Sequence, residues 1–296
     1  MSRSNWGRWG DDDERGALNL QTAATVLAGA GLVRTGRVFA LGLPIQRDGV
    51  PLAPHRPAPS RLTFVGQGDG PELEVPGNDG TVGIHEDALV LATHNETHLD
   101  ALCHIAHLGE LYNGFPDTTV SAHRGATRCG VDRVGPIVGR GVLLDLARHA
   151  GVDFLAPPHV ITADDLAACA AAQDVEVREG DVLLFRTGWL GHWLADPAAV
   201  DWSTQPGLGL DACDFVHDHG VVVVGADNRA VEAQPFAPGA FLSVHVELIV
   251  RQGVLLIEHM VLDDLAAGGV HEFLFVAAPL PITGGMGSPL QPLAIT

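Results

Sequence analysis

Short apolar runs bounded by turn residues predict the secondary structure of this chain. Runs of this kind are typical of buried strands, and they lie at residues 38–44, 88–92, 141–147, 182–185, 221–225 and 254–257. Segments with helical patterning lie at 22–32, 162–172, 210–217 and 241–251. At the second of these, Thr162 and Asp165 have the spacing of a capping box. Alternating strands and helices predict an α/β fold, a single layered domain with a mixed, largely buried sheet flanked by helices.

The predicted domain covers residues 36–296, and residues 1–35 precede it as an N-terminal arm. This arm is either strapped to the body or part of a pocket wall, and the sequence favours the first reading. Residues 47–82 are rich in Gly, Pro and Asp and are predicted to be loop. A loop of that length in a compact domain often covers a site, so His55 and Arg56 are possible substrate contacts.

Three histidines and two carboxylates lie within the eleven residues from His94 to His104. On an extended strand His94 and His98 would stand about 13 Å apart, and on a helix Asp100 would leave their shared face. Only a strand that breaks into a tight turn brings His94, His98 and Asp100 to one point. Imidazole and carboxylate groups suit zinc, manganese or iron. The alternative is a cluster of packed histidines, but the density of groups favours a metal or catalytic site.

His245 and Glu258 are the candidates that complete this site from the second half of the chain. The helix that follows His245 rises about 9–10 Å, and the next strand returns about 16 Å. Glu258 therefore comes back near the start of the helix, at the carboxyl ends of the strands, where open α/β sheets place their sites. Glu247 and His259 offer equal chemistry next to these positions, so spacing alone leaves the pair undecided.

Composition excludes several classes of protein. No run reaches the roughly 18 apolar residues of a membrane span, and the N-terminus lacks an apolar signal core, so we expect a cytoplasmic protein. The net charge of −19 argues against nucleic acid and anionic membranes as partners. All 17 basic residues are Arg, which excludes a Schiff-base or P-loop lysine and is typical of a high-GC bacterial genome.

The four cysteines are widely spaced, so neither disulfides nor a thiolate zinc site is expected. Cys103 lies inside the histidine cluster and could in principle be a nucleophile. Its small apolar neighbours favour a buried structural thiol instead.

The stretch 94–104 resembles the His-x-Gly-Thr-His-x-Asp-x-Pro-x-His signature of the metal-dependent cyclase family, which includes bacterial kynurenine formamidases and isatin hydrolases. The matching residues are His94, Thr97, His98, Asp100 and His104. Glu96 replaces the Gly of the signature, and Leu102 replaces the Pro. Residues 245–258 resemble the late His and Glu element of the family, and residues 283–289 resemble its closing Gly-rich loop.

The resemblance implies the family's swivelling β/β/α fold, a homo-oligomer (dimer or tetramer) and a small-molecule substrate. It also implies a metal-dependent hydrolase that cleaves an amide or cyclic amide C–N bond with metal-activated water, as arylformamidases do. One or two Zn or Mn ions would be held by His94, His98, Asp100, His245 and Glu258. The first three would hold the first ion, and Asp100 would bridge to a second held by His245 and Glu258.

His104 would act as general acid or base and protonate the leaving nitrogen, with a role in orienting Asp100 as the alternative. Tyr112, Phe115 and Trp189 are candidate aromatic contacts to the substrate. Three other functions fit the same residues. They are a metal-dependent lyase or cyclase, a lactonase acting on a small carbonyl compound, and a non-catalytic metal-binding homologue.

Overall fold

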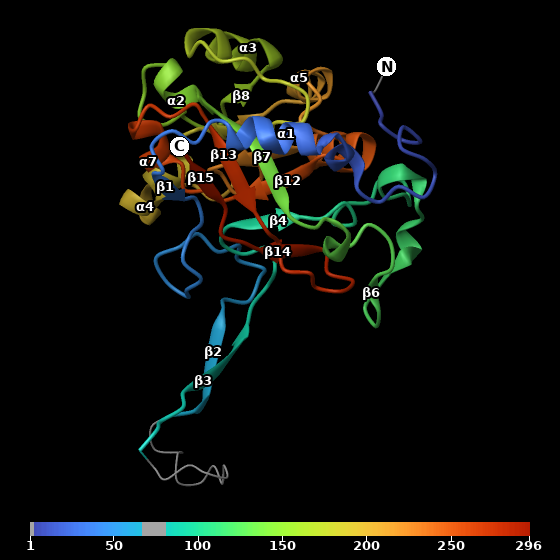
Figure 1. Cartoon of the computed structure of the whole chain (residues 1–296), viewed down its shortest axis with the longest axis vertical. Helices are drawn as coiled ribbons and strands as arrows, with labels where there is room; N and C mark the ends of the chain where they lie inside the picture. Colours follow the sequence, from blue (N-terminus) through green and yellow to red (C-terminus); the bar gives the residue numbers. More distant parts are fainter. Residues whose placement is uncertain (1–2, 67–80) are drawn as a thin grey trace.

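A computed structural model describes residues 3–66 and 81–296 of the chain. Its main feature is a curled mixed sheet of nine strands in the order β1-β15-β13-β7-β9-β11-β12-β4-β14 (Figure 1). The four central strands run parallel, and they are β7 (Ile137–Asp145), β9 (Val182–Arg186), β11 (Val223–Ala226) and β12 (Leu255–Glu258). The outer strands pair antiparallel, and they are β1 (Val38–Ala40), β4 (His98–Asp100), β13 (Glu272–Ala277), β14 (Gly287–Pro289) and β15 (Leu293–Ile295). The predicted α/β fold with a mixed sheet is confirmed.

Helices pack against this sheet as predicted. They are α1 (Ala23–Ala30), α2 (Leu146–His149), α3 (Ala163–Ala172), α4 (Trp189–Ala195), α5 (Ala212–Asp218), α6 (Ser243–His245) and α7 (Asp263–Ala267). Helix α6 continues into a π-helical segment, η6 (Val246–Gln252). The predicted capping box at Thr162 and Asp165 opens α3, and Gly253, with φ of 66°, ends η6. None of the described helices is long and apolar enough to cross a membrane.

Smaller elements fill the connections between these strands and helices. Two short strand pairs are β5 (Val120–Ser121) with β6 (Gly125–Ala126), and β8 (Val160–Ile161) with β10 (Gly207–Leu208). The 3₁₀ turns are η1 (Gly16–Leu20), η2 (Tyr112–Gly114), η3 (Asp117–Thr119), η4 (Val131–Arg133) and η5 (Pro197–Ala199).

The parallel strands read as continuous apolar runs because both of their faces are covered. Every residue of β11 and β12 is buried, as is the apolar part of β9. A strand that has helices or loops on both sides has no solvent face on which to place polar residues. The runs at 182–185, 221–225 and 254–257 were predicted on this basis, and the prediction is confirmed.

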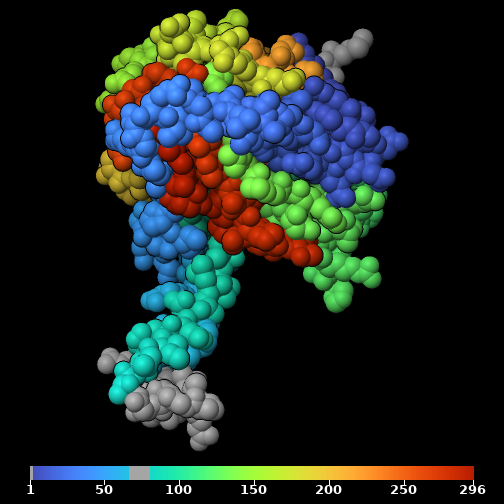
Figure 2. Space-filling model, viewed as in Figure 1, coloured from blue at the N-terminus to red at the C-terminus, as the bar shows by residue number. Residues whose placement is uncertain are grey.

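The strand predicted at residues 88–92 is not buried, and that expectation is wrong. Strand β3 (Glu86–Val90) pairs antiparallel with β2 (Ser60–Val65) in a two-stranded arm that stands away from the body (Figures 1 and 2). In the described part of the chain no third strand covers it, so Leu89 is 47% exposed and Val90 61%. Apolar side chains exposed in this way are typical of a surface that another chain covers. The expected homo-oligomer stays a prediction.

Strand β2 lies inside the segment predicted to be loop, so that prediction was only partly right. Residues 67–80 of the predicted loop lie outside the described residues.

The N-terminal segment is strapped to the body. Trp6 Nε1 donates to the carbonyl of Val250 at 2.5 Å, and the amide of Ala17 donates to the carbonyl of Gly253 at 2.8 Å. Helix α1 packs on β7 and β13, across which it lies in Figure 1. The contact with β7 is so close that a Cβ at Gly29 would come within 2.5 Å of the carbonyl carbon of Gly139. The domain boundary at residue 35 stays a prediction.

We expect Gly29→Ala to lower the free energy of unfolding by about 1–3 kcal/mol, because the added methyl group overpacks the contact between α1 and β7. Helix propensity alone predicts the opposite, since Ala in a helix interior is about 1 kcal/mol better than Gly. Chemical or thermal denaturation measures the change. Gly31→Ala is the matched control, because a Cβ there would lie 3.3 Å from its nearest neighbour. A Gly29→Ala protein as stable as the wild type would contradict the close contact.

Candidate metal centre

The short strand β4 places two of the predicted ligands on one face of the sheet. His98 and Asp100 are two residues apart, so their side chains point the same way. Glu258 closes the neighbouring strand β12 and pairs directly with His98 in the register. His98 Nε2 consequently lies 3.3 Å from Glu258 Oε2 and 3.5 Å from Asp100 Oδ1. The pairing of two strands therefore joins residues that are 158–160 positions apart in the sequence.

His94 and His245 approach the same carboxylates from outside the sheet. A turn between β3 and β4 carries His94, whose Nε2 lies 3.5 Å from Asp100 Oδ1. This is the break between strand and turn that the spacing predicted. Helix α6 carries His245, whose Nε2 lies 3.3 Å from Glu258 Oε1 and 3.9 Å from Asp100 Oδ2. The five predicted metal ligands thus lie together.

His104 also lies within this cluster. Its ring stacks on that of His94 with the centroids 4.1 Å apart, and its Nε2 lies 3.9 Å from Asp100 Oδ1. Its side chain is 24% exposed, whereas that of Asp100 is 1% exposed. Of these two groups, His104 is therefore the one that a substrate in the adjoining pocket can reach.

The unpartnered atoms of this cluster fit a metal ion. His94 Nε2, His98 Nε2 and both carboxylate oxygens of Asp100 are buried and have no hydrogen-bond partner among residues 3–66 and 81–296. Buried polar atoms are rarely left in that state without an ion, a water molecule or a functional role. Imidazole nitrogens and carboxylate oxygens together are a donor set that suits zinc or manganese.

The ligand atoms form two groups, each within 4.8 Å, and the groups share Asp100. One group is His94, Asp100 and His104, and the other is His98, Asp100 and Glu258. This grouping differs from the one predicted, in which His94 and His98 hold the same ion. The reason is that β12 pairs with β4 and brings Glu258 next to His98. The shared position of Asp100 suits a bridging carboxylate.

Charge coupling governs protonation in this cluster. Burial would lower the pKa of His98, but Asp100 and Glu258 raise it to about 10. Burial acts in the same way on His245, and Glu232 and Glu258 raise its pKa to about 10. Burial opposes ionisation of Asp100, yet the histidines around it hold the pKa of its carboxyl well below the usual range. A metal ion that binds here therefore displaces protons, and its affinity increases as the pH rises.

Two hydrogen bonds that the sequence did not reveal orient the ligands. Glu232 Oε1 accepts a bond from His245 Nδ1, and the carbonyl of Glu96 accepts one from His98 Nδ1 at 2.9 Å. Each bond leaves the Nε2 atom of the imidazole to face the cluster, as in many metal sites. No sequence motif marks Glu232, because its contact with His245 forms only when the chain folds.

Glu96 has a left-handed backbone with φ of 41°. Such a conformation favours glycine, which is the residue that the signature has at this place. Glu96 therefore holds a backbone conformation that glycine would adopt more easily.

Three predicted aromatic contacts lie away from the centre. Tyr112 is fully buried and its hydroxyl donates to Asp13 Oδ2 at 3.0 Å, while Phe115 lies 4.7 Å below the guanidinium of Arg128. Trp189 is buried in the core, with its ring 6.1 Å from that of His259. None of the three lines the pocket beside the cluster. Large aromatic side chains were used here to fill the core, which composition cannot distinguish from a binding role.

Cys103 is a buried thiol, as expected. Burial raises its pKa to about 12, so it is protonated at neutral pH and is a poor nucleophile. All four cysteines are buried and unbonded to one another.

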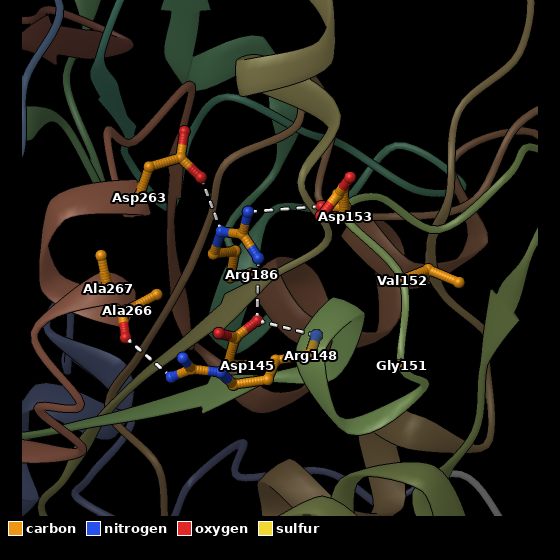
Figure 3. Close-up of a pocket in the computed structure, with 9 residues that line it drawn as sticks. All are labelled: Asp145, Arg148, Gly151, Val152, Asp153, Arg186, Asp263, Ala266 and Ala267. Carbon is orange, nitrogen blue, oxygen red and sulfur yellow. Dashed lines mark hydrogen bonds and ion pairs between the residues drawn. The ribbon is translucent and has the colours of Figure 1, made fainter.

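A pocket of about 450 Å³ lies at the carboxyl ends of β7 and β9, and none of its lining residues belongs to the histidine cluster (Figure 3). Arg186 is at its centre and donates to Asp263, Asp145 and the carbonyl of Asp153. These bonds engage all three nitrogens of the Arg186 guanidinium. Arg186 and its partners therefore form an ion-pair network that joins β9 to α7.

The pocket beside the cluster holds about 430 Å³ and is lined by His104, His245, Glu258 and His259 on one side. Its other walls include apolar side chains, among them Trp202, Phe236 and Phe241, together with His55 and Arg56. His55 and Arg56 were proposed as substrate contacts from a segment predicted to be loop, and both lie in this pocket. The arrangement offers a candidate metal centre at a pocket with both apolar and charged walls.

We expect Glu232→Gln to weaken metal binding by about 10–100-fold, the usual effect of losing a group that orients a ligand. The uncharged amide no longer increases the basicity of His245. Competition with a chromophoric chelator measures the affinity, and Glu110→Gln on the exposed surface is the control. An unchanged affinity in a folded Glu232→Gln protein would contradict the role given to this carboxylate.

Comparison with known proteins gives a consistent result. Residues 39–233 match the family model described as "Putative cyclase". No curated protein matches the chain. A solved structure described as a novel cyclase is 33% identical, with a TM-score of 0.89, covering 99% of this chain and 100% of that one.

Two more distant structures have a similar fold. An isatin hydrolase bound to the product analogue thioisatinate is 22% identical, with a TM-score of 0.63, covering 93% of this chain and 99% of that one. A structure described as a "predicted metal-dependent hydrolase" from Bacillus stearothermophilus is 22% identical, with a TM-score of 0.54, covering 87% and 97%.

Proposed function

Since the chain belongs to the family described as "Putative cyclase", we propose that it is a metal-dependent hydrolase that cleaves the C–N bond of an amide or cyclic amide. The observation that carries the proposal is the convergence of six ligand-type side chains beside a pocket. A structural metal has no need of an adjoining chamber with a partly exposed histidine. The isatin hydrolase of similar fold, with its bound product analogue, supports a cyclic amide as substrate.

The residues proposed to hold the metal are His94, His98, Asp100, His245 and Glu258, with Asp100 between two ions if two bind. Zinc and manganese both suit this set of donors. A divalent ion in such a site lowers the pKa of a water molecule and polarises a carbonyl group.

His104 is the proposed acid and base. Burial lowers its pKa, so the imidazole is neutral at neutral pH and its unprotonated ring nitrogen can accept a proton from the attacking water. The same atom then returns the proton to the leaving nitrogen. Water adds across the C–N bond, which gives a carboxylic acid and an amine. Proton transfer by a positioned group of this kind contributes about 10²–10⁴-fold to a rate.

A hydrolysis assay with a chelator tests the proposal. Formanilide, isatin and a simple lactone are suitable probes, and product masses are measured in H₂¹⁸O. We expect turnover of an amide or lactam that a chelator abolishes and that Zn or Mn restores, with one labelled oxygen in the product. A product that contains no added water would instead indicate a metal-dependent lyase or cyclase. Turnover that is independent of metal would contradict the mechanism.

His104→Ala separates catalysis from metal binding. We expect kcat to fall by about 10²–10⁴-fold while the metal content remains that of the wild type. His107→Ala on the nearby half-buried turn is the control. Full activity in His104→Ala would remove this residue from the mechanism.

A further inference from the structure

The pocket beside the candidate metal centre contains two arginines that pair with no carboxylate of the described residues. Arg56 and Arg229 both line it. In the described part of the chain neither guanidinium lies within 4.0 Å of a carboxylate, although eight other arginines form such ion pairs. In a chain with a net charge of −19, two unpaired cations in one pocket need an explanation.

Arg229 is held in a fixed position but is not saturated. Its Nη2 donates to the carbonyl of Trp202 and to Gln234 Oε1, and its guanidinium lies 5.0 Å from the ring centroid of Trp202. Its Nε atom is buried and has no hydrogen-bond partner. A buried N–H without an acceptor costs free energy, so contacts within the described residues do not use the full hydrogen-bonding capacity of this guanidinium.

Arg56 comes from a different segment of the chain than Arg229. Its Nη1 donates to the carbonyl of His94 at the cluster, which fixes this guanidinium next to the metal centre. It comes from the segment that leads into β2, whereas Arg229 follows β11. Two separate segments thus bring positive charge to the same cavity.

Arg186 shows what a structural arginine looks like in this fold. Its nitrogens are bonded to two carboxylates and a carbonyl (Figure 3). The guanidinium groups of Arg56 and Arg229 use neutral acceptors, so each keeps its full charge for a ligand. The difference between the two kinds of arginine points to a ligand that brings a negative charge.

We propose that the substrate carries a carboxylate in addition to the carbonyl group that reacts, and that Arg229 and Arg56 bind this carboxylate. The planar fork of Arg56 can meet a carboxylate in two parallel hydrogen bonds. Arg229, whose Nη2 already has two acceptors, contributes its charge and its Nη1. The walls made by Trp202, Phe236 and Phe241 receive the apolar body of the same molecule. The substrate class is therefore an amide or lactam with an apolar, aromatic-sized body and an acidic group. The proposal rests on the proposed function only in placing the reacting carbonyl at the metal centre.

Direct binding tests this inference without any need for turnover. The probes are benzoate and benzamide, which have nearly the same shape and differ in charge, titrated calorimetrically into the full-length protein with its metal content measured. We expect benzoate to bind at least about tenfold more tightly than benzamide, because hydrogen bonds to charged groups are stronger than neutral ones.

Variants of the two arginines test whether they cause the preference for benzoate over benzamide. Arg229→Met and Arg56→Met each should weaken benzoate binding by about ten- to hundredfold and leave benzamide binding and metal content unchanged. Arg229→Lys keeps the charge without the fork and should retain part of the preference. The control is Arg61→Met on the arm, where Arg61 pairs with Asp87 at 3.3 Å.

Two outcomes would overturn the inference. Benzoate that binds no better than benzamide would show that the pocket does not select anions. Benzoate binding that is unchanged in both Met variants would place the carboxylate on the metal instead. Loss of hydrolysis with the benzoate preference intact would count against the proposed function alone, so the two failures can be told apart.

Discussion

The pairing of β4 with β12 is the constraint on which the metal centre depends. This antiparallel contact sets His98 opposite Glu258 and turns Asp100 towards the same side. A shift of one residue in the register would point Glu258 to the other face of the sheet. The buried strand β12 cannot slip easily, because its apolar side chains are packed on both faces. Core packing thus fixes the position of a polar site.

The cluster concentrates charge in a place that is poor in water. Asp100, His98 and Glu258 are nearly fully buried, and buried charges are costly unless they are paired. The carboxylates raise the pKa values of His98 and His245, so protons on these imidazoles offset part of the negative charge. The same pairs make the ion compete with protons, so the centre couples metal affinity to pH. Glu232 and the carbonyl of Glu96 hold the imidazoles in the orientation that the ion requires.

Much of this centre could be predicted from the sequence because its signal is local. His94, His98, Asp100 and His104 lie in one short stretch. The lengths of one helix and one strand allow Glu258 to return to His245, and the resemblance to the family singled out this pair. The exposed arm could not be predicted, since an apolar run of β-favouring residues looks alike whether a sheet covers it or not. Glu232 and Arg229 were missed because their roles depend on contacts between distant segments.

The central claim is that the cluster around Asp100 binds a metal ion. Elemental analysis of the purified protein tests this claim most directly. We expect purified protein, or protein reconstituted with Zn or Mn, to hold about one or two equivalents of metal and Asp100→Ala to hold none. Asp117→Ala, on the exposed surface, should bind like the wild type. A folded wild-type protein that takes up no metal, or an Asp100→Ala protein that binds as much as the wild type, would contradict the account, and the cluster would then be a set of packed histidines.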